Sequence, residues 1–223
     1  MSFKKQIRLH VVTPLKKLSA PYERSRYFRS SAAPKINVGC GKNILDGWLN
    51  VDLFPQLAAV QMNAATRWPF EEGTFDAAFC EHMIEHVSKD DACRIIEEMR
   101  RTLRPGGAVR IVTPDLASFA KMALSPEAAD SREYVDSWRD FLDDPHGTPC
   151  DAVNAIFYEH GHRYIYSVDE LSGILTKAGF ANISVMRGGQ YRNPVFQGLD
   201  GHPNLVGQRM NEIEAFAIEA YRP

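Results

Sequence analysis

Beyond residue 35, short apolar runs alternate with longer amphipathic stretches along the chain. The apolar runs predict strands, and the stretches between them have the spacing of helices that bury one face. Alternating strands and helices build a mostly parallel sheet covered on both faces, so we expect a doubly wound α/β fold. The six expected strands are Lys35–Val38, Leu49–Leu53, Phe75–Cys80, Ala108–Val112, Ile183–Met186 and Ile213–Ala220.

Two helices carry clear boundary signals. A stripe of apolar residues at helical spacing follows Ser88, and the turn sequence Arg104–Gly107 is expected to end that helix before the next strand. Ser167 and Glu170 have capping-box spacing, and Gly179 is expected to end the second helix. We expect both apolar stripes to belong to the core and not to a ligand site.

Residues 114–166 do not follow this alternation. A helix is expected from Ser125-Pro126 to about Leu142, followed by a loop rich in histidine, glycine and proline. Insertions of this kind commonly form a lid or a wall of a binding site. We therefore expect a single domain over residues 35–223, with the insertion as its lid or acceptor wall.

The first 34 residues form a basic arm. Residues 1–35 hold nine Lys or Arg and one Glu, whereas the whole chain has a net charge of −2. Pro14 and Pro21 are expected to break any long helix, which favours a solvated tail. A weak contact with a membrane surface stays an alternative for this arm, and we expect no nucleic-acid partner.

Composition narrows the class of protein further. The 223 residues, 44% of them hydrophobic, can bury one substantial core. No apolar run is long enough to span a bilayer, and neither a secretory leader nor paired Cys-x-x-Cys motifs are evident. We therefore expect a cytoplasmic protein.

The first two expected strands end in residues suited to a nucleoside ligand. Glycines at 39 and 41 flank Cys40 and would let a ligand approach the backbone closely. Asp52 ends the second strand, where a carboxylate can accept hydrogen bonds from both ribose hydroxyls. Ile44 replaces the third glycine of a dinucleotide-binding motif, which disfavours a pyrophosphate-binding dehydrogenase.

Several segments together resemble class I S-adenosylmethionine-dependent methyltransferases, especially small bacterial enzymes found with surface-polysaccharide or other glycoconjugate biosynthesis. The resemblance implies a Rossmann-like, seven-stranded sheet with one antiparallel strand. It also implies methyl transfer from S-adenosylmethionine, which we expect to be O-methylation of a sugar, a glycan or another small hydroxylated acceptor. The segments are INVGCGKN, GWLNVDL, WPFEEGTFDAAFCEHMIEH, LRPGGAVRIVTPD, HRYIYSVDELSGILTKAGF and IEAFAIEAYRP.

The same resemblance implies a set of cofactor-binding residues. The methionine part of the cofactor would lie at the first glycine loop, the ribose at the end of the second strand, and the adenine after it. A turn after the third expected strand would close the site beside the methyl group. The implied residues are Gly39, Cys40, Gly41, Asp52, Leu53, Asn63, Ala64 and Glu81.

Two histidines are candidates for the general base that a hydroxyl acceptor requires. His82 follows a strand end near the expected methyl group, and an imidazole has an ordinary pKa near neutrality. His162 could approach the same place from the insertion. For each residue the alternative is a structural histidine that is hydrogen-bonded within the core.

Two other classes of function share these residues. His82-Met-Ile-Glu85-His86 matches the H-x-x-E-H pattern of inverted zinc metalloproteases. That pattern needs the middle of a long helix, whereas here it lies between the strand end at Cys80 and the helix start at Ser88, so we expect no bound metal. A catalytically inactive cofactor-binding or scaffold protein is the second alternative.

Overall fold

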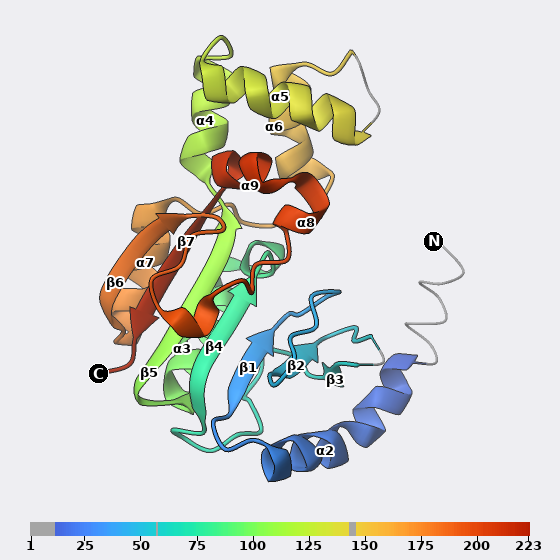
Figure 1. The fold of residues 1–223 in the computed structure, drawn as a ribbon, viewed down its shortest axis with the longest axis vertical. Helices are drawn as coiled ribbons and strands as arrows, with labels where there is room; N and C mark the ends of the chain where they lie inside the picture. Colours follow the sequence, from blue (N-terminus) through green and yellow to red (C-terminus); the bar gives the residue numbers. More distant parts are fainter. Residues whose placement is uncertain (1–11, 57, 143–145) are drawn as a thin grey trace.

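Seven strands form one sheet in the order β3-β2-β1-β4-β5-β7-β6 (Figure 1). The computed structural model describes residues 12–56, 58–142 and 146–223. Strand β7 runs antiparallel to β5 and β6, and the other strand pairs are parallel, which confirms the expected mostly parallel α/β fold. The strands are β1 Lys35–Val38, β2 Leu49–Asp52, β3 Val60–Gln61, β4 Phe75–Glu81, β5 Leu103–Pro114, β6 Ala181–Arg187 and β7 Ala215–Tyr221.

Three details of the strand prediction were wrong. The two-residue strand β3 was missed, because so short a pair shows no alternation. Ile213 lies in a helix, α9 (Gln208–Glu214), where it and Met210 pack at helical spacing against the insertion. Strand β5 begins at Leu103, so the expected turn at Arg104–Gly107 is a bend within the strand, with Gly106 at a φ of 78°.

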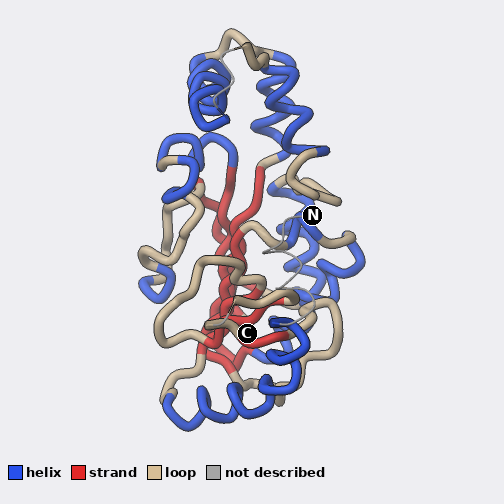
Figure 2. Tube along the Cα trace, turned by 90° about the vertical axis from the view of Figure 1, so that its right-hand side faces the viewer, coloured by secondary structure: helices blue, strands red, loops and turns tan. Residues whose placement is uncertain are grey.

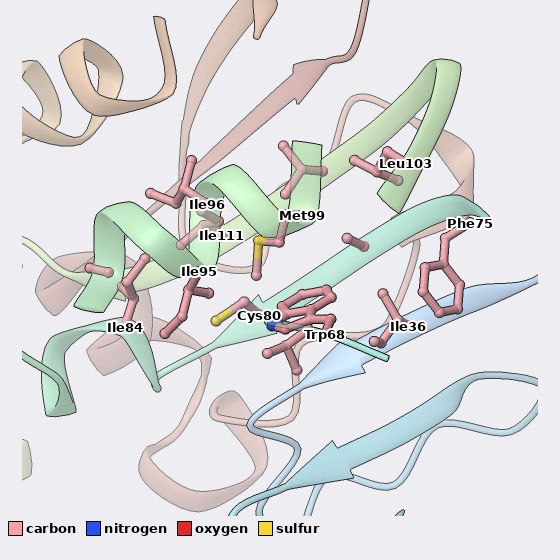
Figure 3. Close-up of a cluster of buried hydrophobic side chains, with 14 of the residues drawn as sticks. Ile36, Trp68, Phe75, Cys80, Ile84, Ile95, Ile96, Met99, Leu103 and Ile111 are labelled. Atoms are coloured by element: carbon pink, nitrogen blue, oxygen red, sulfur yellow. The ribbon is translucent and has the colours of Figure 1, made fainter. Parts of the chain in front are cut away.

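The two helices with clear boundary signals are confirmed, and both cover one face of the sheet. They are α3 (Lys89–Thr102) and α7 (Val168–Ala178). The side chains of Ser88 and Ser167 cap these helices by accepting hydrogen bonds from backbone N–H groups of the first turn. Gly179 ends α7 in the left-handed conformation that glycine favours. Figure 3 shows the core on this side, which includes Trp68, Cys80, Ile95, Ile96, Met99 and Ile111.

The opposite face is covered mainly by residues 189–202, which cross in front of the sheet in Figure 1 and contain the short helix η3 (Pro194–Phe196). Phe196 and Trp48 pack together there, with ring centroids 6.4 Å apart. Arg110 of β5 faces Glu219 of β7 in the strand register. Its buried guanidinium bridges Glu219 at 3.1 Å and Asp200 at 2.6 Å. These ion pairs therefore hold residues 189–202 against the sheet.

The described residues of the insertion form three helices beyond the carboxyl ends of β4 and β5 (Figure 1). They are α4 (Leu116–Leu124), α5 (Ala129–Leu142) and α6 (Pro149–Tyr158). The single helix expected from Ser125 is therefore wrong at its start, and α6 replaces part of the expected loop. The sequence does contain a signal for the start of α6, because Thr148 and Asp151 form a capping box there. These helices share a small core with α9.

The basic arm contains helix α2 (Thr13–Ser30), so the prediction that its prolines prevent a long helix was wrong. Pro14 occupies the first turn, where a missing N–H costs nothing, but Pro21 lies inside the helix. Tyr27 hydroxyl donates to the carbonyl of Lys35 at 2.9 Å, and Phe28 packs against Phe70 and Phe75. Figure 2 shows helices at both ends of the sheet.

Residues 1–11 of the arm lie outside the described residues. Within the described residues, no helix combines the length and the apolar content needed to cross a bilayer.

Glu98 connects α3 to the loop before β4. Its carboxylate accepts hydrogen bonds from the Trp68 backbone N–H at 2.8 Å and from the Arg101 guanidinium at 2.6 and 2.8 Å. Burial acts to raise the pKa of Glu98, but the bonds from Arg101 and Trp68 outweigh it and hold the pKa below its usual 4.5. Arg101 also donates to the Phe70 carbonyl at 2.8 Å.

We expect Glu98→Gln to lower the free energy of unfolding by about 1–3 kcal/mol at neutral pH, because charge-assisted hydrogen bonds are lost. A carboxylate with a lowered folded pKa stabilises the protein above the unfolded value of 4.5, and this contribution is lost as pH falls through the folded pKa. In acid, denaturant titrations should therefore give similar free energies of unfolding for the Glu98→Gln variant and the unmodified protein. The exposed neighbour Glu97→Gln is the control, and an equal loss there would contradict the assignment.

Candidate functional site

The connection from β1 to β2 contains no helix, and a pair of buried asparagines holds it. Asn37 Nδ2 donates to Asn50 Oδ1 at 2.9 Å and to the carbonyl of Asn43 at 2.8 Å. Asn50 in turn bonds the backbone of Leu45 and Trp48. These bonds satisfy the backbone of a connection too short for the usual helix.

Gly39 and Gly41 of this connection are required for different reasons. Gly39 has a φ of 68°, and a Cβ there would lie 2.1 Å from the Met83 side chain. Gly41 has a φ of 50° and nothing within 4 Å of an added Cβ, so its backbone is open to a ligand. Between them, burial and the nearby charge of Asp52 raise the pKa of the Cys40 thiol to about 12, which keeps it neutral.

Asp52 links the two strand ends that were expected to bind the cofactor. Its Oδ2 accepts from the Gly41 N–H at 3.0 Å, and its Oδ1 accepts from the Phe54 N–H at 2.7 Å. Each carboxylate oxygen can accept a further bond. The half-buried group therefore retains acceptors for ribose hydroxyls while it shapes the glycine loop.

The residues after Asp52 provide apolar surface next to it. Leu53 and Phe54 are 43% and 47% exposed and lie side by side in the sequence. The Met62 N–H donates to the Asp52 carbonyl at 2.9 Å, so Asn63 and Ala64 follow directly beside this strand end. An open glycine, a carboxylate and apolar side chains fit the methionine, ribose and adenine parts of S-adenosylmethionine.

Glu81 makes contacts that the sequence did not suggest. Its carboxylate accepts from the Asn43 side chain at 2.9 Å and from the backbone N–H groups of Gly201 and His202 at 2.9 and 3.0 Å. Glu81 therefore joins the glycine loop to residues 199–202. Its predicted contact with the cofactor stays a prediction.

His82 starts the turn that follows β4, in a left-handed conformation with a φ of 45°. Its Nδ1 lies 3.3 Å from Oε1 of the fully buried Glu85. Burial acts to lower the pKa of His82, but the hydrogen bond and charge of Glu85, with the charges of Glu214 and Glu81, raise it overall. Its Nε2 is buried and has no hydrogen-bond partner among the described residues.

A second imidazole–carboxylate pair lies against the first. The rings of His82 and His202 stack with centroids 3.8 Å apart. His202 Nε2 lies 2.6 Å from Glu214 Oε1, and the Tyr134 hydroxyl donates to Glu214 Oε2 at 2.8 Å. Burial acts to raise the pKa of Glu214, but the bonds from His202 and Tyr134 and the nearby His82 lower it overall. His202 and Glu214 were not predicted as site residues, because neither belongs to a spaced motif.

These groups line one cavity of about 350 Å³ between the end of β4, the insertion and α9. A larger cavity, about 480 Å³, lies beside β6 and contains none of these imidazoles. The smaller cavity is therefore the candidate acceptor site. Its lining includes His82, Glu85, His86, Tyr134, Trp138, Ile156, His160, His162, His202 and Glu214.

The insertion contributes His162 to this cavity, so the two predicted histidines lie in one site. His162 Nδ1 contacts the Ile156 carbonyl at 2.5 Å, and its ring centroid is 4.7 Å from that of His86. Burial lowers the pKa of His162 and favours a neutral ring. The backbone carbonyl of Glu85 accepts from the N–H groups of Arg163 and Tyr164, which fixes the insertion beside this turn.

The H-x-x-E-H segment has the local structure that the sequence analysis expected. Its last three residues form the single turn η2 (Ile84–His86), and it precedes α3. A long helix through this motif, which an inverted zinc protease requires, is not formed by these residues.

Structural comparison identifies the same fold in several solved methyltransferases. A phosphoethanolamine N-methyltransferase 2 from Haemonchus contortus, solved with S-adenosylhomocysteine, has a TM-score of 0.51 at 15% identity, covering 86% of this chain and 49% of that one. A methyltransferase from Archaeoglobus fulgidus has a TM-score of 0.50 at 14% identity, with 93% of each chain covered. A putative methyltransferase from Bacillus halodurans has a TM-score of 0.50 at 13% identity, covering 89% and 98%.

Sequence comparison identifies the family. No curated protein sequence matches the chain. A family model described as a methyltransferase domain matches residues 25–185, which is most of the chain and includes α3, the sheet from β1 to β5, and the insertion. With the glycine loop, Asp52 and the fold described above, this match shows that the chain belongs to the methyltransferase-domain family and is an S-adenosylmethionine-dependent methyltransferase.

Proposed function

We propose that the protein methylates a hydroxyl group of a small polyhydroxylated acceptor, such as a sugar or a sugar unit of a glycan. The observation that carries this proposal is the cavity with two stacked imidazole–carboxylate pairs, His82–Glu85 and His202–Glu214. A hydroxyl is a weak nucleophile that gains from a base, whereas a neutral amine needs less help. The resemblance to glycoconjugate enzymes supports the same acceptor class.

His82 is the base that this geometry favours. Glu85 faces its Nδ1, so in the neutral ring that nitrogen carries the proton and Nε2 keeps a lone pair. The His82 side chain lines the cavity. Its Nε2 atom is buried and has no hydrogen-bond partner among the described residues. Where an acceptor hydroxyl reaches this nitrogen, Nε2 would accept the hydroxyl proton as the acceptor oxygen bonds to the methyl group. S-adenosylmethionine supplies that methyl group on a sulfonium, which is already a good leaving group.

The rest of the cavity suits a sugar-sized molecule. Its volume of about 350 Å³ is at the lower end of small-molecule sites. Trp138, 6% exposed, offers a flat apolar face, and the imidazoles and carboxylates offer donors and acceptors for several hydroxyls. His202, held by Glu214, is placed to orient such a hydroxyl beside His82.

We expect Asp52→Ala to weaken S-adenosylmethionine binding about tenfold or more, because charge-assisted hydrogen bonds worth about 1.5–3 kcal/mol are removed. Asp46→Ala removes an exposed carboxylate from the same connection and should leave the affinity near that of the unmodified protein. Calorimetric titration of both folded variants tests the assignment. Equal affinities in the two variants would refute Asp52 as the ribose ligand.

We expect His82→Gln to lower turnover about 10²–10⁴-fold, because the proton acceptor is lost, while cofactor affinity changes little. Turnover is measured with methyl-labelled S-adenosylmethionine and a panel of monosaccharides and nucleotide sugars. His146→Gln, at an exposed residue shortly before α6, is the control. Transfer to amines only would contradict the hydroxyl proposal, and cofactor binding without transfer to any acceptor would favour the inactive alternative.

A further inference from the structure

We propose that Glu85, His86 and His162 form a binding site for a divalent transition-metal ion of the zinc class. One ligand atom from each residue lies within 4.8 Å of the others. The three residues come from two separate parts of the chain, the turn η2 and the end of the insertion, and all three line the acceptor cavity. No metal was expected, because H-x-x-E-H lies between a strand end and a helix start and not in a long helix. The spacing within that motif does not show that His162 lies beside it.

The two imidazoles are held in the orientation that a metal ligand needs. His162 contacts the Ile156 carbonyl through Nδ1 at 2.5 Å, and His86 contacts the Gly161 carbonyl through Nδ1 at 3.4 Å. A carbonyl only accepts, so Nδ1 of each ring carries the proton and Nε2 is left with a free lone pair. Metal-binding histidines typically donate their other ring N–H to a carbonyl or carboxylate in this way.

The carboxylate of Glu85 gives an independent indication of a bound cation. It is fully buried, and the Thr113 hydroxyl donates to Oε2 at 3.1 Å. Apart from the 3.3 Å contact with His82 Nδ1, Oε1 has no polar partner among the described residues. A buried carboxylate oxygen without a strong partner is costly, and a coordinated cation would offset that cost.

The spacing of the group can contract to that of a bound ion. Ligand atoms around tetrahedral zinc lie roughly 3.3 Å apart, since each lies about 2.0–2.2 Å from the metal. His86 is exposed and His162 only half buried, so small side-chain rotations can close the difference. The backbone bonds from Arg163 and Tyr164 to the Glu85 carbonyl already hold the two segments together.

The ligand set determines the type of ion. Two imidazoles and one carboxylate suit zinc and its neighbours in the first transition row, whereas calcium and magnesium prefer oxygen ligands alone. Three protein ligands leave at least one coordination position for a molecule in the cavity. If the proposed hydroxyl methylation holds, the ion would bind the acceptor hydroxyl and lower its pKa beside His82. Metal binding itself does not rest on that function.

The test is titration of the chelator-treated full chain with ZnCl₂ by calorimetry, without cofactor or acceptor. We expect one saturable site per chain, and visible absorption typical of low coordination when CoCl₂ replaces zinc. His86→Gln and His162→Gln should each weaken zinc binding by roughly tenfold or more. His160 is the control, because its ring centroid is 5.7 Å from that of His162 but it is not one of the three proposed ligands. The His160→Gln variant should bind zinc with the affinity of the unmodified protein.

Glu85→Gln removes a buried charge and can fail to fold, so the two histidine variants decide the outcome, with circular dichroism as the folding check. Absence of saturable zinc or cobalt binding, or unchanged affinity in both histidine variants, would overturn the site. Cofactor binding and methyl transfer in the presence of chelator separate the two proposals. Full activity without metal would remove the ion from the reaction and leave the proposed function intact.

Discussion

The buried ion pairs of Arg110 are the constraint on which the acceptor side of the molecule depends. Arg110 lies on the interior strand β5. Its partners are Glu219 on the neighbouring strand β7 and Asp200 in residues 189–202, the segment that covers one face of the sheet. Leaving one such charge unpaired typically costs about 3–5 kcal/mol, so the segment cannot detach cheaply. Residues 199–202 are thereby fixed over the sheet, and Glu81 positions the backbone of His202 at the end of β4.

The Glu219 carboxylate also orders the start of the covering segment. It accepts from the backbone N–H groups of Arg192 and Asn193 at 3.1 and 2.7 Å, while Asp200 accepts from the Gly189 N–H at 2.9 Å. The backbone of an irregular segment needs such partners because it has no ladder of its own. One face of the sheet is thus covered by packed helices. The other face is covered by residues 189–202, which ion pairs and hydrogen bonds to buried carboxylates hold in place.

Local signals determined how much could be predicted from the sequence. The strands β1 and β4 and the helices α3 and α7 have clear apolar patterns or caps, and they were predicted to within a few residues. Strand β5 was predicted only from Ala108 onward. Helix α2 was not, because the packing of Tyr27 and Phe28 on the domain overcomes the local cost of Pro21. The insertion was recognised as irregular, but its three helices are stabilised by a core shared with distant α9.

The candidate site divides in the same way. The glycine loop and Asp52 belong to a motif that is contiguous in sequence, and His82 follows a predicted strand end. His202 and Glu214 have no motif, and they reach the cavity only because β7 pairs with β5.

This topology also affects biosynthesis. Strand β6 joins the sheet only through β7, so β5 keeps an unpaired edge until β7 leaves the ribosome, on the order of ten seconds after β5 at typical elongation rates. During that interval the nascent chain has a hydrophobic strand edge for a chaperone to shield, and its cofactor half can fold before any acceptor site exists.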